Sequence, residues 1–365
     1  MHLDFLPSRT LTLYLAKMFA VRIAAVLVML VLVLMMMDLL SESGKILAVS
    51  GNGQPELLSY ATMRIPQLVA RFLPYSVLLA TLITLVGLNQ NSEVIAMKAA
   101  GLSAHQVLAP LVLTAAAVSL GSFAFNERFV TRATATLKAW QANDYAAVPK
   151  DSGVRANVYV TDGPDILAAA TVTGNGGAMH MRGVTFYDRS PDGMIIAKTT
   201  APTATYAAPG WRLTDARRFE VQGANAITLP SVVVARGVTP QQIELARVDP
   251  ETKSFLALSD SIARYGEAGR NADELRTAWW HKLSGPLSAA LMPILGSIAA
   301  FGLARSGQLF VRALIGMALG FAYFVVDNAA LAMGGFGGYP PLLAAFGPFL
   351  LFLLIGETML IRTEE

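Results

Sequence analysis

The stretch that decides the fold is Met18 to Leu40, which reads MFAVRIAAVLVMLVLVLMMMDLL. A helix of this length rises about 1.5 Å per residue, which is enough to cross the roughly 30 Å hydrocarbon core of a bilayer. Arg22 and Asp38 lie near its two ends, where their side chains can extend to the polar surfaces. The run is also longer than the roughly 7–15 apolar residues of a secretory signal, so it predicts an anchor that stays in the protein.

Further apolar runs fall in two groups on either side of a long polar middle. The six predicted spans are Met18 to Leu40, Phe72 to Leu88, Val107 to Phe125, Leu283 to Leu303, Ala313 to Met333 and Leu342 to Ile361. The whole chain of 365 residues is 54% hydrophobic and only 15% charged, which is typical of a membrane protein. A helical membrane protein with six spans is therefore expected.

Several classes of chemistry are excluded. The chain has no cysteine, so disulfides, thiolate metal sites and cysteine nucleophiles are out. It has no phosphate-binding loop of the G-x-x-x-x-G-K-[ST] type, no H-E-x-x-H and no G-x-S-x-G, and its four histidines lie in separate segments without ligand spacing. A net charge of +3 is too small for a nucleic-acid-binding surface. We expect a chain without a catalytic site, a metal or a cofactor, and without a nucleic-acid partner.

The positively charged residues in the short segments predict the orientation. One side would carry seven of them: Arg9, Lys17, Arg22, Lys98, Arg305, Arg312 and Arg362. The other side would carry three: Lys45, Arg64 and Arg71. By the positive-inside rule both termini are cytoplasmic, and the segment from Asn126 to Lys282 lies outside the cytoplasm.

The polar middle changes to short runs of alternating or β-branched residues broken by turn signals. The six predicted strands are Asn157 to Thr161, Ile166 to Thr173, Met181 to Tyr187, Met194 to Thr200, Trp211 to Arg218 and Ile227 to Val234. Helical segments flank them at Glu127 to Tyr145 and Ser254 to Ala268. An all-β sandwich, jelly roll or open barrel is expected, which gives a division into residues 1–125, 126–282 and 283–365.

The loop between the second and third spans, residues 89–103, reads NQNSEVIAMKAAGLS. Val94, Met97 and Ala100 recur at helical spacing, and Gly101 is suited to end the helix. Such a helix across the cytoplasmic face can be held by a soluble partner, with Glu93 paired to an arginine. The alternative is a plain interfacial helix in which Glu93 complements the helix dipole.

Ser92 to Gly101 resembles the coupling helix of the lipopolysaccharide export permeases, the LptF and LptG family. The resemblance covers nearly the whole chain, with six spans and a β domain inserted between the third and fourth. The local matches, which look more like the G-type than the F-type subunit, are Thr239-Pro240 through Val248-Asp249-Pro250, Trp280-His281-Lys282 through Pro286-Leu287-Ser288, and Val326-Asp327-Asn328 through Tyr339-Pro340-Pro341.

The resemblance implies a non-catalytic permease of an ATP-binding-cassette transporter in the bacterial inner membrane. Its partners would be an LptF-like subunit and a dimeric LptB-like ATPase that binds ATP and Mg. The transporter would extract lipopolysaccharide, and a periplasmic β-jellyroll would pass it to LptC-like and LptA-like bridge proteins. By the same resemblance, the ATPase-coupling residues are Ser92, Glu93, Met97, Ala100 and Gly101.

One feature departs from the G-type pattern. G-type subunits carry several lysines near the outer end of the first span, suited to lipid phosphates, whereas this chain has Asp38, Ser41 and Glu42 there. The substrate-binding candidates are therefore Asp38, Lys45, Arg64 and Arg71. Arginine can hold phosphate through two hydrogen bonds, but these arginines can equally pair with nearby carboxylates or extend to the membrane surface.

Asp327 and Asn328 are polar residues inside the fifth predicted span. A charge there is costly, so Asp327 is expected to face the helix bundle or a cavity, and Asn328 to bond between helices. Two rival functions stay open. One is a permease for another lipid or lipoprotein, and the other is a membrane-anchored receptor or enzyme that works through its β domain.

Overall fold

The computed structural model describes residues 6–146, 148, 154–174, 176–223, 225–244, 246, 248–267, 269–297 and 309–362. The chain divides into two compact units. The first, the helical unit, comprises Met1–Met37, Ile65–Val130 and Gly269–Glu365. The second, the β unit, comprises Asp38–Arg64 and Thr131–Ala268.

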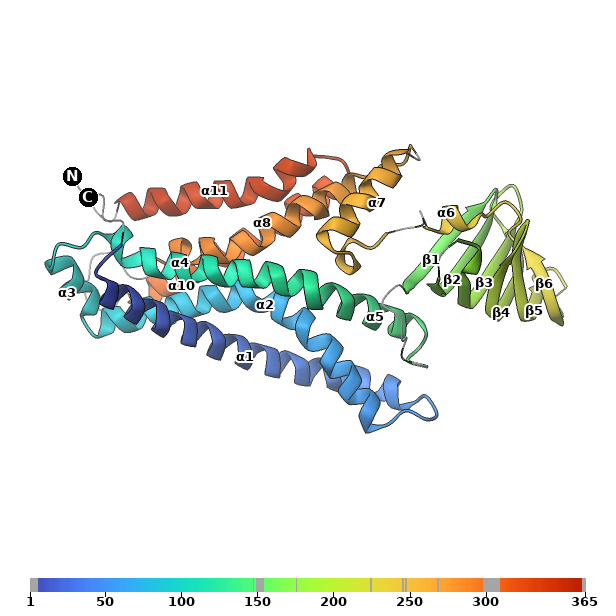
Figure 1. The fold of residues 1–365 in the computed structure, drawn as a ribbon, viewed down its shortest axis with the longest axis horizontal. Coiled ribbons are helices and arrows are strands. Elements are labelled where there is room, and N and C mark those ends of the chain that lie inside the picture. The colour runs from blue at the N-terminus through green and yellow to red at the C-terminus, as the bar shows by residue number, and fades with distance from the viewer. Residues whose placement is uncertain are drawn as a thin grey trace. The chain divides into compact units, whose positions relative to one another are not determined.

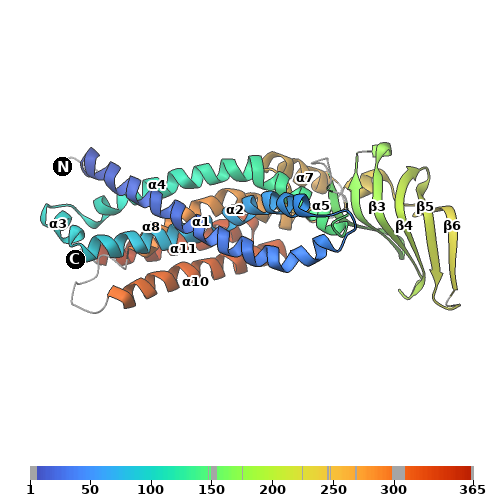
Figure 2. The same cartoon turned by 90° about the horizontal axis from the view of Figure 1, so that it is seen from below.

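Long helices make up the helical unit, and Figures 1 and 2 show them running beside one another. They are α1 (Arg9–Leu47), α2 (Gln54–Gln90), α4 (Ala104–Phe125), α8 (Asp273–Gly296), α10 (Leu309–Gly335) and α11 (Pro341–Arg362), with the short α3 (Glu93–Ala99) between α2 and α4. The C-terminal end of α1 and the N-terminal end of α2, called their outer ends below, belong to the β unit as the segment Asp38–Arg64. Each long helix except α8 contains an apolar window long enough to cross a bilayer.

The described residues therefore contain five candidate spans rather than the predicted six. The missing one is the fourth, Leu283 to Leu303, of which the structure describes residues 283–297. α8 begins earlier, at Asp273, and its described part ends at Gly296, so polar residues of its first turns fill a large share of its length. Residues 298–303 of this predicted span lie outside the described part of the chain, and the sixth span is not confirmed.

The core of the helical unit joins side chains from all of its long helices. Leu15, Val77, Leu111, Leu295 and Phe352 are among its fully or nearly fully buried members. Arg22 of α1 donates to the backbone oxygen of Ile83 at 3.3 Å, so it bonds to α2 rather than only extending to the membrane surface. The helices are thus packed against one another through apolar side chains and interhelical hydrogen bonds, the interactions that hold helices together in a bilayer.

Six antiparallel strands form the sheet of the β unit, in the order β1-β2-β3-β4-β5-β6 (Figure 1). They are β1 (Arg155–Asp162), β2 (Asp165–Thr173), β3 (His180–Arg189), β4 (Ile195–Ala207), β5 (Gly210–Glu220) and β6 (Asn225–Val234). All six predicted strands are confirmed, with β4 longer than expected. The jelly roll is not confirmed, because every strand pairs with its neighbour in sequence.

One face of the sheet carries the core of the β unit. Val184, Trp211 and Leu213 are almost completely buried there, and the Trp211 indole donates to the backbone oxygen of Val238 at 2.9 Å. The alternation of buried and exposed residues along β4 and β5 follows the two-residue period of a strand. The chain enters the sheet at the start of β1 and leaves it at the end of β6, which lie at the same end.

Short helices connect the sheet to the long ones. Before it, the π-helix η1 (Asn126–Val130) continues α4 and leads into α5 (Thr131–Ala142). After it come α6 (Pro240–Glu244), the 3₁₀ turn η3 (Pro250–Thr252) and α7 (Phe255–Glu267). The helices η1 and α5 match the first predicted flanking helix, and α7 matches the second, except that Ala268 lies outside the described residues. The short α6 and η3 were not predicted.

Candidate functional site

The short helix α3 is fixed to the helical unit by one apolar face. Val94 and Met97 are buried in the same core as α1, α2 and α4. Ser92 precedes the helix with φ of 60°, and Gly101 follows it with φ of +87°. The Leu102 amide donates to the Met97 oxygen at 3.1 Å, which closes the last turn around Gly101. α3 is therefore a rigid turn of helix.

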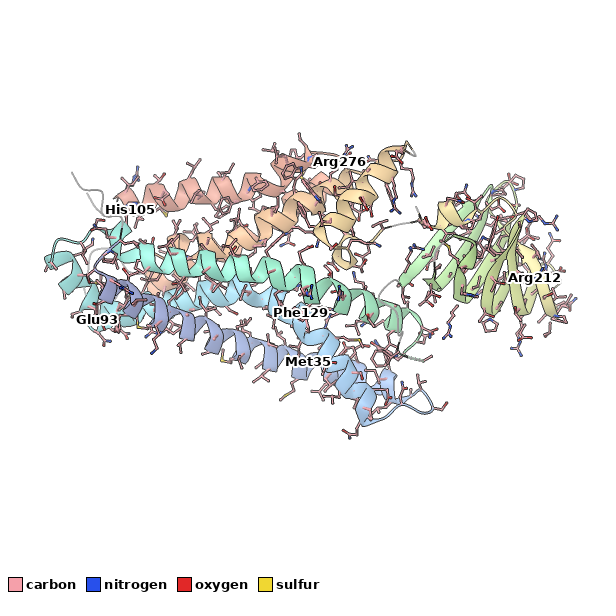
Figure 3. The ribbon with its side chains drawn as sticks, in the orientation of Figure 1. Met35, Glu93, His105, Phe129, Arg212 and Arg276 are labelled. Atoms are coloured by element: carbon pink, nitrogen blue, oxygen red, sulfur yellow. The ribbon has the colours of Figure 1, made fainter. Side chains whose placement is uncertain are left out.

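The other face of α3 is open. Ile95 is 53% exposed, and Ser92 and Ala100 are exposed as well, although Ala100 was expected to share the apolar face. Figure 3 shows Glu93 at the same end of the helical unit as His105, and the start of α1 and the end of α11 lie there too. Glu93 is partly exposed, and a carboxylate that solvent reaches beside an apolar side chain is suited to a protein partner that supplies a cation.

Glu93 already has one contact within the chain. The Tyr14 hydroxyl of α1 donates to Glu93 Oε2 at 3.3 Å. This hydrogen bond is exposed and long, so it contributes little to stability while it holds the carboxylate near α1. The sequence gives no sign of it, because Tyr14 and Glu93 are 79 positions apart.

A second polar contact ties the same end together. His105, in the first turn of α4, lies 3.2 Å from Glu357 of α11, measured from Nε2 to Oε2. α4 begins with a capping box, in which Ser103 Oγ accepts from the Gln106 amide and the Gln106 side chain accepts from the Ser103 amide. The capping box is readable from the sequence, but the contact between His105 and Glu357 is not.

The outer ends of α1 and α2 carry the residues expected to contact substrate. Arg64 holds Asp38 through two hydrogen bonds, Nε to Oδ2 at 3.0 Å and Nη2 to Oδ1 at 2.9 Å. The Tyr60 hydroxyl donates to the same Oδ2 at 2.6 Å. Of the roles considered for Arg64, the structure shows pairing with Asp38, a strong two-pronged geometry.

Lys45 forms a single ion pair with a residue of its own helix. Its Nζ lies 2.9 Å from Glu42 Oε1, and the Tyr145 hydroxyl donates to Glu42 Oε2 at 2.7 Å. Burial raises the pKa of Tyr145 to about 12, so its hydroxyl stays a donor at any physiological pH. Arg71 differs from these residues, because it is exposed and forms no hydrogen bond or ion pair within the part of the chain that the structure describes.

Asp327 of α10 faces the interior of the helical unit, with 6% of its surface exposed. Its Oδ1 is buried without a hydrogen-bond partner among the described residues. Asn328 donates to the backbone oxygen of Phe324 at 2.7 Å, so this hydrogen bond lies within α10. The sequence had led us to expect a bond between helices. A buried carboxyl oxygen without a partner is costly in a membrane, which marks Asp327 as a residue of interest.

The described residues contain no group of three or more histidine, aspartate or glutamate side chains placed to hold a metal ion. The features that the geometry offers are an exposed helix turn, ion pairs at the outer helix ends and one buried carboxyl group. A model of the family described as lipopolysaccharide export system permease LptF/LptG matches residues 13–362.

The chain belongs to the LptF/LptG permease family. It is 25% identical to the lipopolysaccharide export system permease protein LptG of Escherichia coli K12 over 325 residues, which cover 86% of this chain and 88% of that one. It is 22% identical to the protein of the same name from Haemophilus influenzae over 310 residues, covering 84% and 86%. The family resemblance that the residues of α3 indicated is confirmed.

Members of this permease family are membrane transport subunits, which fits the apolar helices of this chain. A permease subunit carries out no catalysis itself. Both relatives are named LptG, which is the subunit type that the sequence indicated for this chain.

Proposed function

We propose that this chain is the G-type permease subunit of an ATP-binding-cassette transporter that extracts lipopolysaccharide from the bacterial inner membrane. Its partners would be an LptF-like permease, a dimeric LptB-like ATPase that binds ATP and Mg, and LptC-like and LptA-like bridge proteins. The observation that carries the proposal is α3. It is buried through Val94 and Met97, and it presents Glu93 and Ile95 on its open face.

The mechanism assigned to α3 follows from its attachment. A helix turn packed rigidly into the core moves only if the helices around it move. A partner that grips Glu93 and Ile95 can therefore transmit its own closure to α1, α2 and α4. Ser92 and Gly101 contribute by fixing the two turns through their positive φ, and Met97 by holding the buried face.

The proposed topology has six spans, with α8 as the fourth, both termini in the cytoplasm and the β unit in the periplasm. The support is the excess of lysine and arginine on the side that carries α3 and both chain ends. The β unit would receive the acyl chains of the lipid before the bridge proteins do.

For the lipid headgroup we propose that Arg71 makes the first contact. It is exposed, whereas Arg64 is held by Asp38 and Lys45 by Glu42. A lipid phosphate would have to compete with Asp38 for Arg64 in a partly buried ion pair, which is costly to break. The pair of Lys45 with Glu42 is weaker, because 66% of the Lys45 side chain is exposed.

The proposal is tested by isolating the tagged full-length chain from its own bacterium with bound proteins and lipids. Mass spectrometry should identify an F-type permease, an ATPase and a phosphorylated glycolipid. A different lipid or a lipoprotein would favour the first rival function. Recovery of the chain alone, with activity in its β unit, would overturn the proposal.

A further inference from the structure

A cavity of about 120 Å³ lies in the β unit, where the connecting helices meet the first strand. Its wall comes from four separate segments: α5, the start of β1, the stretch from α6 to η3, and α7. One water needs about 10–15 Å³ in this measure, so the cavity has room for a small tetrahedral oxyanion.

The wall is rich in positive charge. It includes four cations, Lys138, Arg155, Lys253 and Arg264, against two carboxylates, Glu244 and Asp249. The carboxylates are already engaged. Asp249 binds Lys138 at 2.6 Å and caps η3 by accepting from the Glu251 amide at 3.0 Å, while Glu244 accepts from the Gly176 amide at 3.2 Å.

Lys253 and Arg264 have no such partner: their side chains form no hydrogen bond or ion pair with any described residue. Burial lowers the pKa of Lys253, and the charges of Arg155 and Arg264 lower it further. Burial also lowers the pKa of Arg155, against the pull of Glu244. The partly buried cations therefore repel one another and destabilise the folded chain, and a bound anion would remove this repulsion.

Part of this wall is the segment Val248-Asp249-Pro250, which the α3-based function leaves unexplained. Pro250 begins η3, Asp249 caps it, and the turn places Lys253 on the cavity wall. The Val248 amide donates to the Tyr265 hydroxyl at 3.2 Å, which ties this segment to α7 and Arg264. The cations therefore lie on a built frame rather than on flexible loops.

We propose that this cavity is a binding site for a phosphate group, held by Lys253 and Arg264 with Arg155 behind them. Guanidinium and ammonium groups bind phosphate oxygens through short charge-assisted hydrogen bonds, and arginine does so through two of them. The phosphate belongs either to a lipid headgroup or to free inorganic phosphate. The site stands on its own cavity and charges, so it does not depend on the transport function proposed above.

The first test follows inorganic phosphate with the full-length chain in detergent. Thermal unfolding is compared in phosphate and in chloride at equal ionic strength. Binding is followed by the broadening of the phosphorus NMR line of inorganic phosphate when the protein is added. Phosphate should raise the unfolding temperature of the wild type, and the double variant Lys253→Gln/Arg264→Gln should bind it roughly tenfold more weakly or worse. Arg212→Gln, which removes an exposed cation of β5 (Figure 3), is the matched control and should bind as the wild type does.

A loss of binding through misfolding is distinguishable. Without phosphate, the double variant should unfold at the same temperature as the wild type or higher, because it relieves repulsion. Lys253→Arg, which keeps the charge, should retain binding. The proposal is overturned if phosphate and chloride act alike on the wild type, or if the double variant responds to phosphate as fully as the wild type does.

The second test separates the two sources of phosphate. The chain is placed in phosphatidylcholine bilayers with and without phosphatidic acid, and binding of inorganic phosphate is measured again. Displacement of inorganic phosphate by phosphatidic acid supports a lipid headgroup as the ligand. Undiminished binding of inorganic phosphate supports the free anion. Failure of both anions to bind contradicts the site and leaves the transporter assignment unaffected.

Discussion

At the residue scale, the most informative contacts join positions far apart in sequence. Tyr14 reaches Glu93, His105 reaches Glu357, and Arg64 holds Asp38 across two helices. Each contact holds a charged side chain in a defined position, and its strength determines how readily that side chain can bind another partner. Glu93 is partly exposed and its hydrogen bond to Tyr14 is long, so this carboxylate can exchange its partner at little cost.

Replacing Tyr14 with phenylalanine tests this exchange. Tyr14 competes with a partner's cation for Glu93, so Tyr14→Phe should tighten the ATPase complex by up to roughly fivefold, the equivalent of about 1 kcal/mol for one exposed hydrogen bond. Titration of the purified ATPase against the reconstituted permease measures the change. A loss of affinity as large as that of Glu93→Ala would mean instead that Tyr14 positions the carboxylate.

Asp327 offers a second test at this scale. Its buried Oδ1 is without a hydrogen-bond partner in the described residues, so Asp327→Leu should raise the unfolding temperature, because an unsatisfied buried polar atom costs about 1–3 kcal/mol. If the residue serves transport, the variant assembles with the F-type subunit and releases less lipid. Assembly that fails in Asp327→Leu would assign it a structural role. Asn328→Leu, which removes a bond within α10 alone, is the control.

Lys253 gives a pH dependence with a definite sign. Its pKa is lowered in the folded chain, so the charged form destabilises the fold at neutral pH. That penalty is relieved as the pH rises through the lowered pKa toward the ordinary value of 10.5. Lys253→Gln should therefore unfold at a higher temperature than the wild type at pH 7, and the difference should vanish above about pH 10.5. Melting curves without phosphate measure it, and a difference that grows with pH would contradict the cause given.

At the element scale, α3 depends on the two turns that bound it. Gly101 adopts φ of +87°, which a side chain makes unfavourable by about 1–2 kcal/mol. Hydrophobic spacing predicted the helix, its buried face at Val94 and Met97, and its end at Gly101. It did not predict the exposure of Ala100, which follows the last helical residue and lies about 120° around the helix axis from Val94.

Gly101→Ala should weaken this turn. The unfolding temperature should fall, and the affinity for the ATPase should fall with it, since α3 loses its fixed end. Gly121→Ala is the matched control, because Gly121 lies in α4 with open space around the position of a Cβ and no positive φ. Thermal unfolding and ATPase titration of both variants decide the matter. Equal behaviour of the two would show that the left-handed turn is not required.

The strands and the helices differ in how far the sequence defines them. Turn residues and alternation placed five of the six strands to within a few positions, because the turns and the alternating burial are both written in local sequence. They located the start of β4 but not its end, which lies at Ala207 rather than Thr200. Helix ends were less predictable. α1 continues to Leu47 and α2 starts at Gln54, so both helices extend beyond their apolar runs. Contacts between the two helices, such as Asp38 with Arg64, stabilise these polar ends, and hydropathy alone does not predict them.

At the scale of the whole molecule, the apolar runs and the polar middle predicted two kinds of structure, helical and β. The structure divides the chain in the same sense, but its boundary runs through α1 and α2, whose outer ends belong to the β unit. Composition cannot reveal such a division, because it depends on side chains that meet across long sequence separations, such as Glu42 and Tyr145. For the same reason, the contact of Tyr14 with Glu93 and the cavity beside β1 could not be predicted from the sequence.

The central claim is that α3 transmits the action of an ATPase through Glu93. Its most direct test reconstitutes the chain with its F-type partner and ATPase, and follows ATP hydrolysis and lipid release for wild type, Glu93→Ala and Glu267→Ala. Glu267 is an exposed glutamate of α7 and serves as the control. The account predicts that Glu93→Ala lowers both activities or dissociates the ATPase, while Glu267→Ala changes neither. Full activity of an intact Glu93→Ala complex would contradict it.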